Sequence, residues 1–393
     1  MGEEIAPETP LTRVVDGNRL TLLTRGSDRL EALIELIESA EHSLRILYYI
    51  FHADETGTRV RDALIAAAGR GVETSLLVDG FGSTSSAPFL RPLSEAGIAF
   101  CRFSPKYGRR YLLRNHQKLA VADERRVLIG GFNVADEYFA PVEENGWRDI
   151  GLLVEGESVA RVAAYFDDLF RWTRTPGGSA RELRRMLRVH SVTRGKLRWL
   201  FGGPSRRLSP WARAVRRDLR SAISLDLIAA YFGPTPGILR RITGVVRRRG
   251  GRARIITAAR SDVRAAVAAA RSLYWYLLRR GVEIYEHRAS RMHTKLVVID
   301  DAVHIGSANF DMRSLFLNLE MMLRIEDPEF ATAMRRFVDG EAAASERITL
   351  ESHDRERTWL NRLRWAFGYF LFAVADYGIT RRLNLDDVGL PPA

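Results

Sequence analysis

The sequence contains the same succession of motifs twice, and this duplication constrains the fold more than any other feature. The segment SAEHSLRILYYIF at 39–51 is similar to SAISLDLIAAYF at 221–232, and each predicts the end of a helix followed by a strand. A helix, a capping glycine (Gly71 or Gly250) and a buried strand follow in both copies. These helices and strands are predicted at 59–70 and 74–78, and at 238–249 and 253–257. A repeat of this length indicates that one structural unit is built twice.

A third match extends the repeat and defines the domains. The segments Glu95–Phe103 and Arg279–His287 each predict a helix end followed by a strand. Helices that alternate with strands predict an α/β fold made of two similar sandwich domains. The predicted parts are a first domain at 1–172, a basic linker with Gly and Pro at 173–215, a second domain at 216–345 and an aromatic, amphipathic C-terminal segment at 346–393.

The most specific part of the repeat is a His-x-Lys-x4-Asp motif followed by a glycine turn that ends in asparagine. The first copy contains His116, Lys118, Asp123, Gly131 and Asn133, and the second contains His293, Lys295, Asp300, Ser307 and Asn309. The His, Lys and Asp of each copy are the predicted catalytic residues. In an extended segment, the His and Lys of His-x-Lys point to the same side. The glycine turn lets the backbone approach an oxyanion, and the asparagine adds an amide donor.

Two such halves facing each other would offer paired imidazole, ammonium and carboxamide groups to a phosphate. Two-step phosphoryl transfer needs one histidine as nucleophile and the other as general acid, with cations at the non-bridging oxygens. One copy of the motif is expected by chance in roughly one or two chains in a hundred of this length, so the second copy carries the argument. Lysine usage supports it, because two of only four lysines among 60 basic residues stand in these motifs.

Outside the two motifs, few residues are candidates for a functional role. Asp149 and Glu320 follow the two asparagines by sixteen and eleven residues and are candidates for orienting the imidazoles. The remaining histidines form no spaced cluster and Cys101 is the only cysteine, so no metal, cofactor or disulfide is predicted.

The positive charge belongs to one part of the chain. The net charge is +12, yet residues 171–260 hold 23 basic and three acidic residues, so the rest is acidic. This indicates an anionic partner. Two aromatic and basic segments, 196–207 and 359–382, are candidates for binding a membrane interface, although neither is long enough to span it. The alternatives are a C-terminal helix packed on the core and a solvated arginine-rich linker.

These motifs resemble the phospholipase D superfamily and, more closely, bacterial cardiolipin synthases of the soluble-domain type that lacks N-terminal membrane helices. The likeness extends over about residues 29–152 and 219–345. It includes the segments Tyr49-Ile50-Phe51, Asp136-Glu137-Tyr138, Gly281 to Glu286, Gly306 to Ser314 and Asn318-Leu319-Glu320.

The resemblance implies two domains about a pseudo-twofold axis with the active site at their interface. His116 would be the nucleophile that forms a phosphohistidine and His293 the general acid and base, although the two roles could be exchanged. The phosphate would be held by Lys118, Lys295, Asn133 and Asn309 with the turns at Gly131 and Ser307, while Glu320 and Asp149 would orient the imidazoles. Two departures are that Gly131 stands where many members have serine, and that the second hairpin is one residue shorter.

The predicted function is therefore transfer of a phosphatidyl group to phosphatidylglycerol, making cardiolipin. Alternatives are a phospholipase D-type hydrolase and a nuclease or other phosphodiesterase, whereas two intact motifs argue against a non-catalytic binding protein. Aromatic residues in the candidate anchors favour an anionic membrane surface over nucleic acid. Because the acidic N-terminus shows no signal peptide, the predicted location is peripheral, on the cytoplasmic face of the inner membrane. The oligomeric state is left open.

Overall fold

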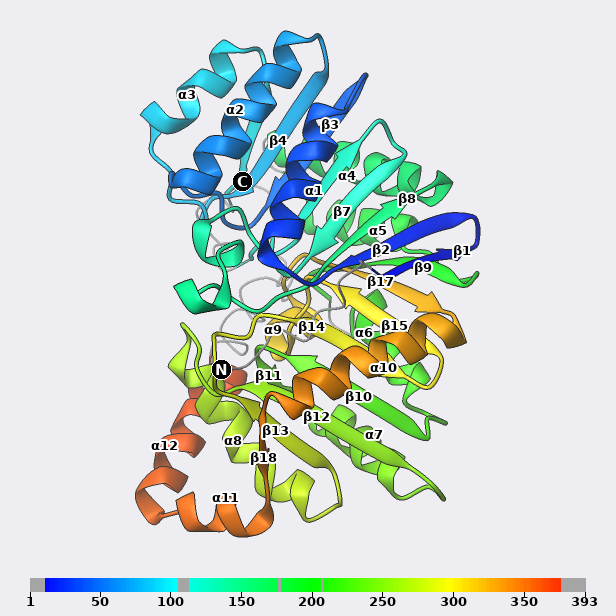
Figure 1. Cartoon of the computed structure of the whole chain (residues 1–393), viewed down its shortest axis with the longest axis vertical. Coiled ribbons are helices and arrows are strands. Elements are labelled where there is room, and N and C mark those ends of the chain that lie inside the picture. The colour runs from blue at the N-terminus through cyan, green and yellow to red at the C-terminus, as the bar shows by residue number, and fades with distance from the viewer. Residues whose placement is uncertain (1–10, 105–112, 176–177, 206–207, 376–393) are drawn as a thin grey trace, which may run out of the picture.

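The computed structural model describes residues 11–104, 113–175, 178–205 and 208–375 and shows two stacked α/β units (Figure 1). The first sheet has the order β1 (Leu11–Val15), β2 (Asn18–Leu23), β8 (Gly151–Glu155), β7 (Arg126–Gly130), β6 (Leu119–Ala122), β3 (Ser43–Tyr48), β4 (Glu73–Asp79) and β5 (Ala99–Phe103). The second has the order β18 (Glu346–Ile348), β13 (Glu283–His287), β12 (Arg252–Ala258), β10 (Ser224–Ala229), β14 (Lys295–Ile299), β15 (Ala302–Gly306), β17 (Glu320–Glu326) and β9 (Leu197–Gly202).

The strand order confirms the predicted duplication. Read from β5 to β2, the first sheet has the same succession as the second sheet from β13 to β9. In both, three parallel strands (β3, β4, β5 and β10, β12, β13) continue into antiparallel ones. The predicted shorter hairpin is also confirmed, because two residues join β14 to β15 and three join β6 to β7. A small parallel pair, β11 (Phe232–Gly233) and β16 (Phe310–Asp311), lies beside the second sheet.

Helices cover the outer face of each sheet. The first sheet packs against α1 (Gly26–Glu38), α2 (Glu55–Gly69) and α3 (Ala87–Glu95), and the second against α6 (Pro210–Asp218), α7 (Pro236–Val246) and α8 (Arg264–Leu278). The remaining elements are α4 (Ala160–Arg174), α5 (Ala180–His190), α9 (Met312–Phe316), α10 (Pro328–Ala343) and the short helices η1 (Asp136–Tyr138), η2 (Val142–Glu144) and η3 (Glu157–Val159). In α2, Val60, Leu64 and Ala67 recur at helical spacing and are fully buried, which is why this sequence forms an amphipathic helix.

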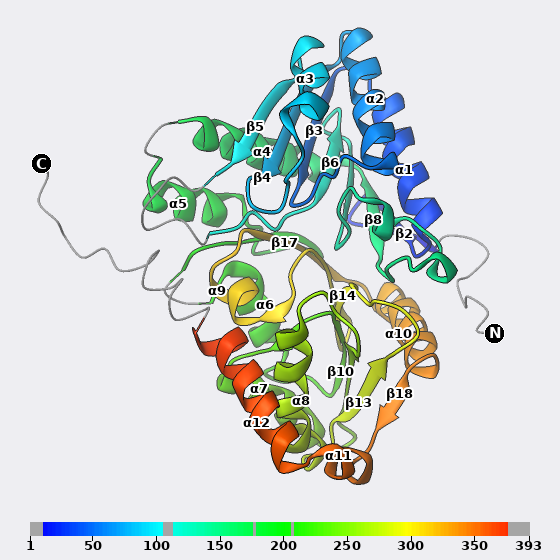
Figure 2. The same ribbon diagram turned by 90° about the vertical axis from the view of Figure 1, so that its left-hand side faces the viewer.

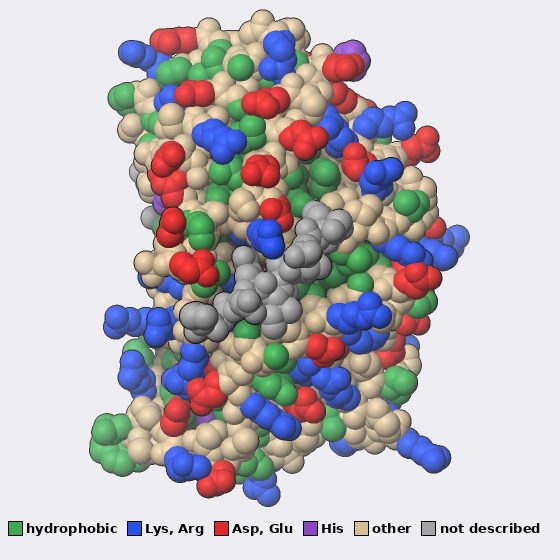
Figure 3. Space-filling view, in the orientation of Figure 1, with side chains coloured by type: hydrophobic (Ala, Val, Ile, Leu, Met, Phe, Trp, Pro, Cys, Tyr) green, Lys and Arg blue, Asp and Glu red, His purple; other side chains and the backbone are tan. Residues whose placement is uncertain are grey.

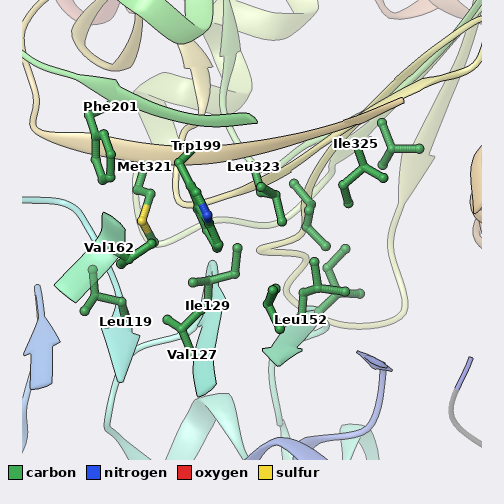
Figure 4. Close-up of a cluster of buried hydrophobic side chains, with 14 of the residues drawn as sticks. Leu119, Val127, Ile129, Leu152, Val162, Trp199, Phe201, Met321, Leu323 and Ile325 are labelled. Atoms are coloured by element: carbon green, nitrogen blue, oxygen red, sulfur yellow. The ribbon is translucent and has the colours of Figure 1, made fainter. Parts of the chain in front are cut away.

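One continuous core joins the two units. Figure 4 shows side chains of the first unit, such as Leu119, Ile129 and Leu152, facing Trp199 and Leu323 of the second. A buried side chain of this size contributes about 1.5–3 kcal/mol relative to an exposed one. This packing fixes the two halves against each other and thereby positions anything that lies between them.

The stretch predicted as a linker differs from expectation. Residues 173–215 contain α5, β9 and the first part of α6, and β9 is an edge strand of the second sheet, antiparallel to β17. Trp199, Leu200 and Phe201 are buried there, so they cannot anchor the protein in a membrane. The apolar residues between the cations belong to a core strand. In sequence alone, such a strand resembles an interfacial segment because both place aromatic residues next to basic ones. Residues 206–207 at its end lie outside the described part.

The C-terminal segment packs on the second unit and also exposes an apolar face. After β18, helices α11 (Leu350–Glu356), α12 (Trp359–Tyr369) and η4 (Phe370–Ala375) follow, with α12 lying along α8 (Figure 2). Gly368 allows close contact, because a Cβ there would lie 2.5 Å from the Cβ of Ala268. On its other side α12 exposes 59–68% of the surface of Trp359, Leu360, Leu363 and Phe367. The segment therefore packs on the core, as one alternative expected, and its binding to a membrane stays a prediction. Residues 376–393 lie outside the described part.

None of the helices in the described ranges has the length and hydropathy needed to cross a bilayer.

Candidate active site

A cavity of about 540 Å³ lies where the two units meet, and it contains the motif residues of both. His116 and Asn133 line it from the first unit, and His293 and Asn309 from the second. The structure thus brings together four side chains that the sequence separates by up to 193 residues. The two copies of the motif form one site.

Main-chain hydrogen bonds between the units hold each histidine. The His116 N–H donates to the Leu319 carbonyl at 2.9 Å, and the His293 N–H donates to the Arg148 carbonyl at 2.7 Å. Each contact is part of an isolated bridge, Asn115 with Leu319 and Arg148 with Met292. Each histidine segment is therefore paired with the segment of the other unit that carries a buried carboxylate.

Those carboxylates orient the imidazoles across the interface. His116 Nδ1 lies 3.1 Å from both carboxylate oxygens of Glu320, and His293 Nδ1 lies 2.7 Å from Asp149 Oδ2. With Nδ1–H donated to a carboxylate, the other ring nitrogen, Nε2, is the one left for chemistry. Both residues predicted to orient the imidazoles thus contact them, and each belongs to the unit opposite its histidine.

Further donors hold Glu320 and Asp149 in the ionised form. The hydroxyls of Ser307 and Ser314 donate to Glu320 at 2.5 and 2.8 Å, and the Ile150 N–H donates to Asp149 at 2.8 Å. Burial alone would raise the pKa of both carboxyls. For Glu320 the interaction with His116 and the charge of Lys118 outweigh burial and lower the pKa. For Asp149 the charge of Lys295 and the bond to His293 do the same.

Gly131 and Ser307, predicted to contact the phosphate, lie against these carboxylates. Ser307 donates its hydroxyl to Glu320, as described above. At Gly131 a Cβ would lie 2.7 Å from both carboxylate oxygens of Asp149 and 3.0 Å from Lys295 Cδ. This contact explains why the first copy has glycine where the second has serine: the serine supports its carboxylate, and the glycine leaves room for the other.

The motif lysines are buried beside the histidines. Lys118 Nζ donates to the His116 carbonyl at 2.6 Å, and Lys295 Nζ donates to the His293 carbonyl. Burial lowers the pKa of Lys118 well below its ordinary value and that of Lys295 to about 8, although Glu320 and Asp149 oppose this shift. The two lysines lie close to the imidazoles. That they contact a phosphate directly stays a prediction.

Asp123 and Asp300 do not reach the cavity, contrary to the predicted catalytic role. Both lie in hairpin turns at the far end of β6 and β14 from the histidines, with φ of +50° and +46°. The Asp123 carboxylate accepts the N–H groups of residues 41–43, and Asp300 accepts those of residues 223 and 224. Their contacts are structural: they tie each hairpin to the start of the neighbouring parallel strand.

Burial also sets the protonation of the two histidines. It lowers the pKa of His116 and of His293, and the neighbouring lysine charges lower both further, while the partner carboxylates raise them. The net direction is downward, which favours the neutral form of both rings near pH 7. A bound phosphodiester anion acts in the opposite direction and favours an imidazolium.

Several cavity residues were not singled out as site residues from the sequence. The rings of Tyr49 and Tyr138 stand edge-on to His116 and His293, with centroids 5.1 and 5.2 Å apart. Arg114 and Arg313 also line the cavity. The signal for Arg114 was its position two residues before His116, which places it on the same side of an extended segment.

In the described part of the chain, His52, Asp54 and Glu137 are the one group of side chains close enough to hold a metal ion. None of them lines the cavity. Asp54 accepts the N–H groups of Gly57 and Asp136, so it serves as the N-cap of α2.

The duplicated fold with a paired-histidine site at its interface places the chain in the phospholipase D class. The family profile described as "Cardiolipin synthase, PLD-like domain" matches residues 33–171 and 216–340, and the chain belongs to this family.

Curated relatives agree with this assignment. Cardiolipin synthase 1 of Bacillus cereus is 32% identical over 327 residues, which cover 78% of this chain and 63% of that protein. The chain thus spans less than two thirds of that relative's length. Cardiolipin synthase B of Escherichia coli K12 is 31% identical over 364 residues, covering 88% of this chain and 86% of that protein.

Solved structures show the same fold at low identity. The phosphatidylserine synthase of Haemophilus influenzae superposes with a TM-score of 0.71 at 15% identity, covering 95% of this chain and 97% of that one. The polyphosphate kinase of Porphyromonas gingivalis gives 0.57 at 15% identity, covering 93% and 57%.

Proposed function

We propose that the protein is a phosphatidyltransferase that makes cardiolipin from two molecules of phosphatidylglycerol through a phosphohistidine. The observation that carries this proposal is the pair of crossed contacts, His116 with Glu320 and His293 with Asp149, at a single cavity. Two oriented imidazoles facing one cavity supply a nucleophile and a general acid at once.

In the first step, His116 Nε2 attacks the phosphorus of one phosphatidylglycerol. The P–N bond forms as the P–O bond to the head-group glycerol breaks, and His293 Nε2 gives its proton to the departing alkoxide. Glycerol leaves and the phosphatidyl group stays on His116. Asn133 and Asn309 both line the cavity, and in this proposal their carboxamides bind the non-bridging oxygens.

In the second step, the neutral His293 removes the proton from a head-group hydroxyl of a second phosphatidylglycerol. The resulting oxygen attacks phosphorus, the P–N bond breaks and cardiolipin forms. His293 is again protonated and His116 is again neutral, so the cycle balances. The lowered pKa of His293 favours the neutral ring that accepts a proton in this step, and the charge of a bound phosphodiester favours the protonated ring needed in the first step.

Analysis of products by mass spectrometry tests the proposal. The purified protein is mixed with phosphatidylglycerol vesicles, with and without phosphatidylethanolamine. We expect cardiolipin and free glycerol in equal amounts. Phosphatidic acid and glycerol without cardiolipin would instead identify a hydrolase, and cleavage of an oligonucleotide in a parallel reaction would identify a nuclease.

We also propose that the protein binds the cytoplasmic surface of the membrane through α12. The exposed apolar residues of α12, here named the α12 ridge, are Trp359, Leu360, Leu363 and Phe367. The chain runs on from the ridge into the cavity wall, because Leu371 and Phe372 of η4 line the cavity. Phe81 is exposed and lines it too. Apolar residues around the opening suit a substrate whose acyl chains stay in a bilayer.

Replacing Leu363 and Phe367 with serine is expected to weaken vesicle binding by at least tenfold. The reason is that each side chain contributes about 1.5–3 kcal/mol when it leaves water, and 1.4 kcal/mol corresponds to a factor of ten. Sedimentation with phosphatidylglycerol vesicles measures the effect. Val14→Ser is the control, because Val14 is equally exposed on β1. Unchanged binding of the double variant would exclude the α12 ridge as the anchor.

A further inference from the structure

A second cavity, of about 710 Å³, lies between α6 and α7 on the outer side of the second unit. Four arginines line it, Arg213 and Arg216 from α6 and Arg240 and Arg241 from α7, and we name it the arginine groove. Its apolar lining comes from Leu208, Ile238 and Phe316. No carboxylate is among its lining residues in the described part of the chain.

The surrounding sequence does not supply the missing negative charge. Residues 208–251 contain nine arginines and two acidic residues, Asp218 and Asp226. Asp218 is engaged by His304 and Arg324, each at 2.8 Å, and Asp226 by Arg254 at 2.7 Å. Both carboxylates are therefore hydrogen-bonded to residues outside the groove and do not neutralise the groove arginines.

The groove arginines lie among other positive charges. Besides burial, the neighbouring Arg217 and Arg188 lower the pKa of Arg213. The groove residue Arg216, together with Arg220 and Arg248 outside the groove, lowers the pKa of Arg241 in the same way. Arg213 donates to the Leu208 carbonyl, which is neutral. Guanidinium groups held together in this way are stabilised by an anion from outside.

We propose that the arginine groove binds the phosphate of an anionic phospholipid head group, at a site separate from the catalytic cavity. Guanidinium forks match phosphate oxygens in bidentate geometry, and the apolar lining suits the glycerol and first acyl carbons of a lipid. Thr235 and the start of α7 also face the groove. The proposal uses the proposed function only in assuming that the protein meets a membrane.

The apolar lining of the groove, and not charge alone, favours a lipid over a nucleic acid. Figure 2 places α6 and α7 on the side of the second unit opposite α10. The face that contains α10 carries acidic and basic side chains intermingled (Figure 3). The short helix α9 links the groove to the active site, since Phe316 lines the groove and Arg313 lines the catalytic cavity.

The test compares Arg216→Gln/Arg240→Gln with a matched control, Arg336→Gln/Arg347→Gln. The control removes two exposed arginines from α10 and β18, so the change in net charge is the same. Binding is measured in a His116→Ala background, so that no turnover occurs, on phosphatidylcholine vesicles with and without phosphatidylglycerol. We expect the groove variant to lose affinity for the anionic vesicles by about 10- to 30-fold, and the control to stay near the parent. Equal binding by both variants would overturn the proposal.

Two competition arms separate other sources of the anion. Inorganic phosphate or a short oligonucleotide is titrated against the anionic vesicles. The proposal expects neither to displace the protein at concentrations that leave the ionic strength unchanged; displacement by either would overturn the assignment to lipid. The active site is checked separately, with the groove variant made in the protein that keeps His116. Its turnover of short-chain, monomeric phosphatidylglycerol is measured. Normal turnover with weak vesicle binding supports the groove, whereas loss of turnover together with normal vesicle binding contradicts it.

Discussion

Replacement of His116 by alanine is expected to reduce phosphatidylglycerol turnover by at least about 10⁴-fold. The variant lacks the nitrogen that forms the P–N bond, and no other described side chain of the cavity is an imidazole except His293, which is fixed by Asp149. Release of glycerol measures the loss. His304→Ala is not a suitable control because that ring is buried and hydrogen-bonded to Asp218, so the exposed His42→Ala serves instead.

The two histidines are told apart by a substrate whose leaving group needs no proton, a phosphatidyl ester of p-nitrophenol. His293→Ala should release nitrophenol in a burst and accumulate the phosphohistidine, because the acid is no longer required and the base for the second step is missing. His116→Ala should remain inactive on this ester. The reverse pattern would show that the two roles are exchanged.

The second large effect is expected from the buried carboxylate that holds the nucleophile. Glu320→Gln should lower turnover by about 10³- to 10⁴-fold, as loss of the orienting carboxylate does in the Ser-His-Asp triad. The amide leaves His116 Nδ1–H without its charged acceptor and disturbs the hydroxyls of Ser307 and Ser314, which both donate to Glu320. The measurement is the turnover number with thermal unfolding recorded in parallel.

Asp149→Asn is the matched variant for the other histidine. Because Asp149 contacts His293, its loss should impair proton transfer but leave attack intact. The nitrophenyl ester should therefore restore the first step in Asp149→Asn and not in Glu320→Gln. If both variants respond alike to the ester, the carboxylates do not act each through one imidazole.

Much of the fold could be predicted from the sequence because the signal was local and repeated. Alternating apolar runs and glycine stops predicted the parallel strands β3, β4 and β5 and their counterparts β10, β12 and β13. The two histidines and two asparagines were found because each stands in a short motif whose second copy excludes chance.

What could not be predicted depends on contacts between distant segments. The motif itself suggested that Gly131 and Ser307 contact the phosphate. In the structure Gly131 lies against Asp149 and Ser307 against Glu320, and these contacts depend on how the chain folds around the site. Asp123 had the spacing of a catalytic acid, yet its strand carries it away from the cavity to bind main-chain N–H groups. The strand β9 was misread because aromatic residues between cations occur both in edge strands and at membrane interfaces.

The crossed contacts between units have a consequence for how this active site can be lost. Each imidazole takes its tautomer from a carboxylate on the other side of the interface, so neither unit contains a complete catalytic group by itself. A small separation of the units would disable attack and proton transfer together, while each sheet and its own helices stayed folded. Activity therefore requires the two units to stay in contact, and we expect it to be lost before either unit unfolds when the packing between them weakens.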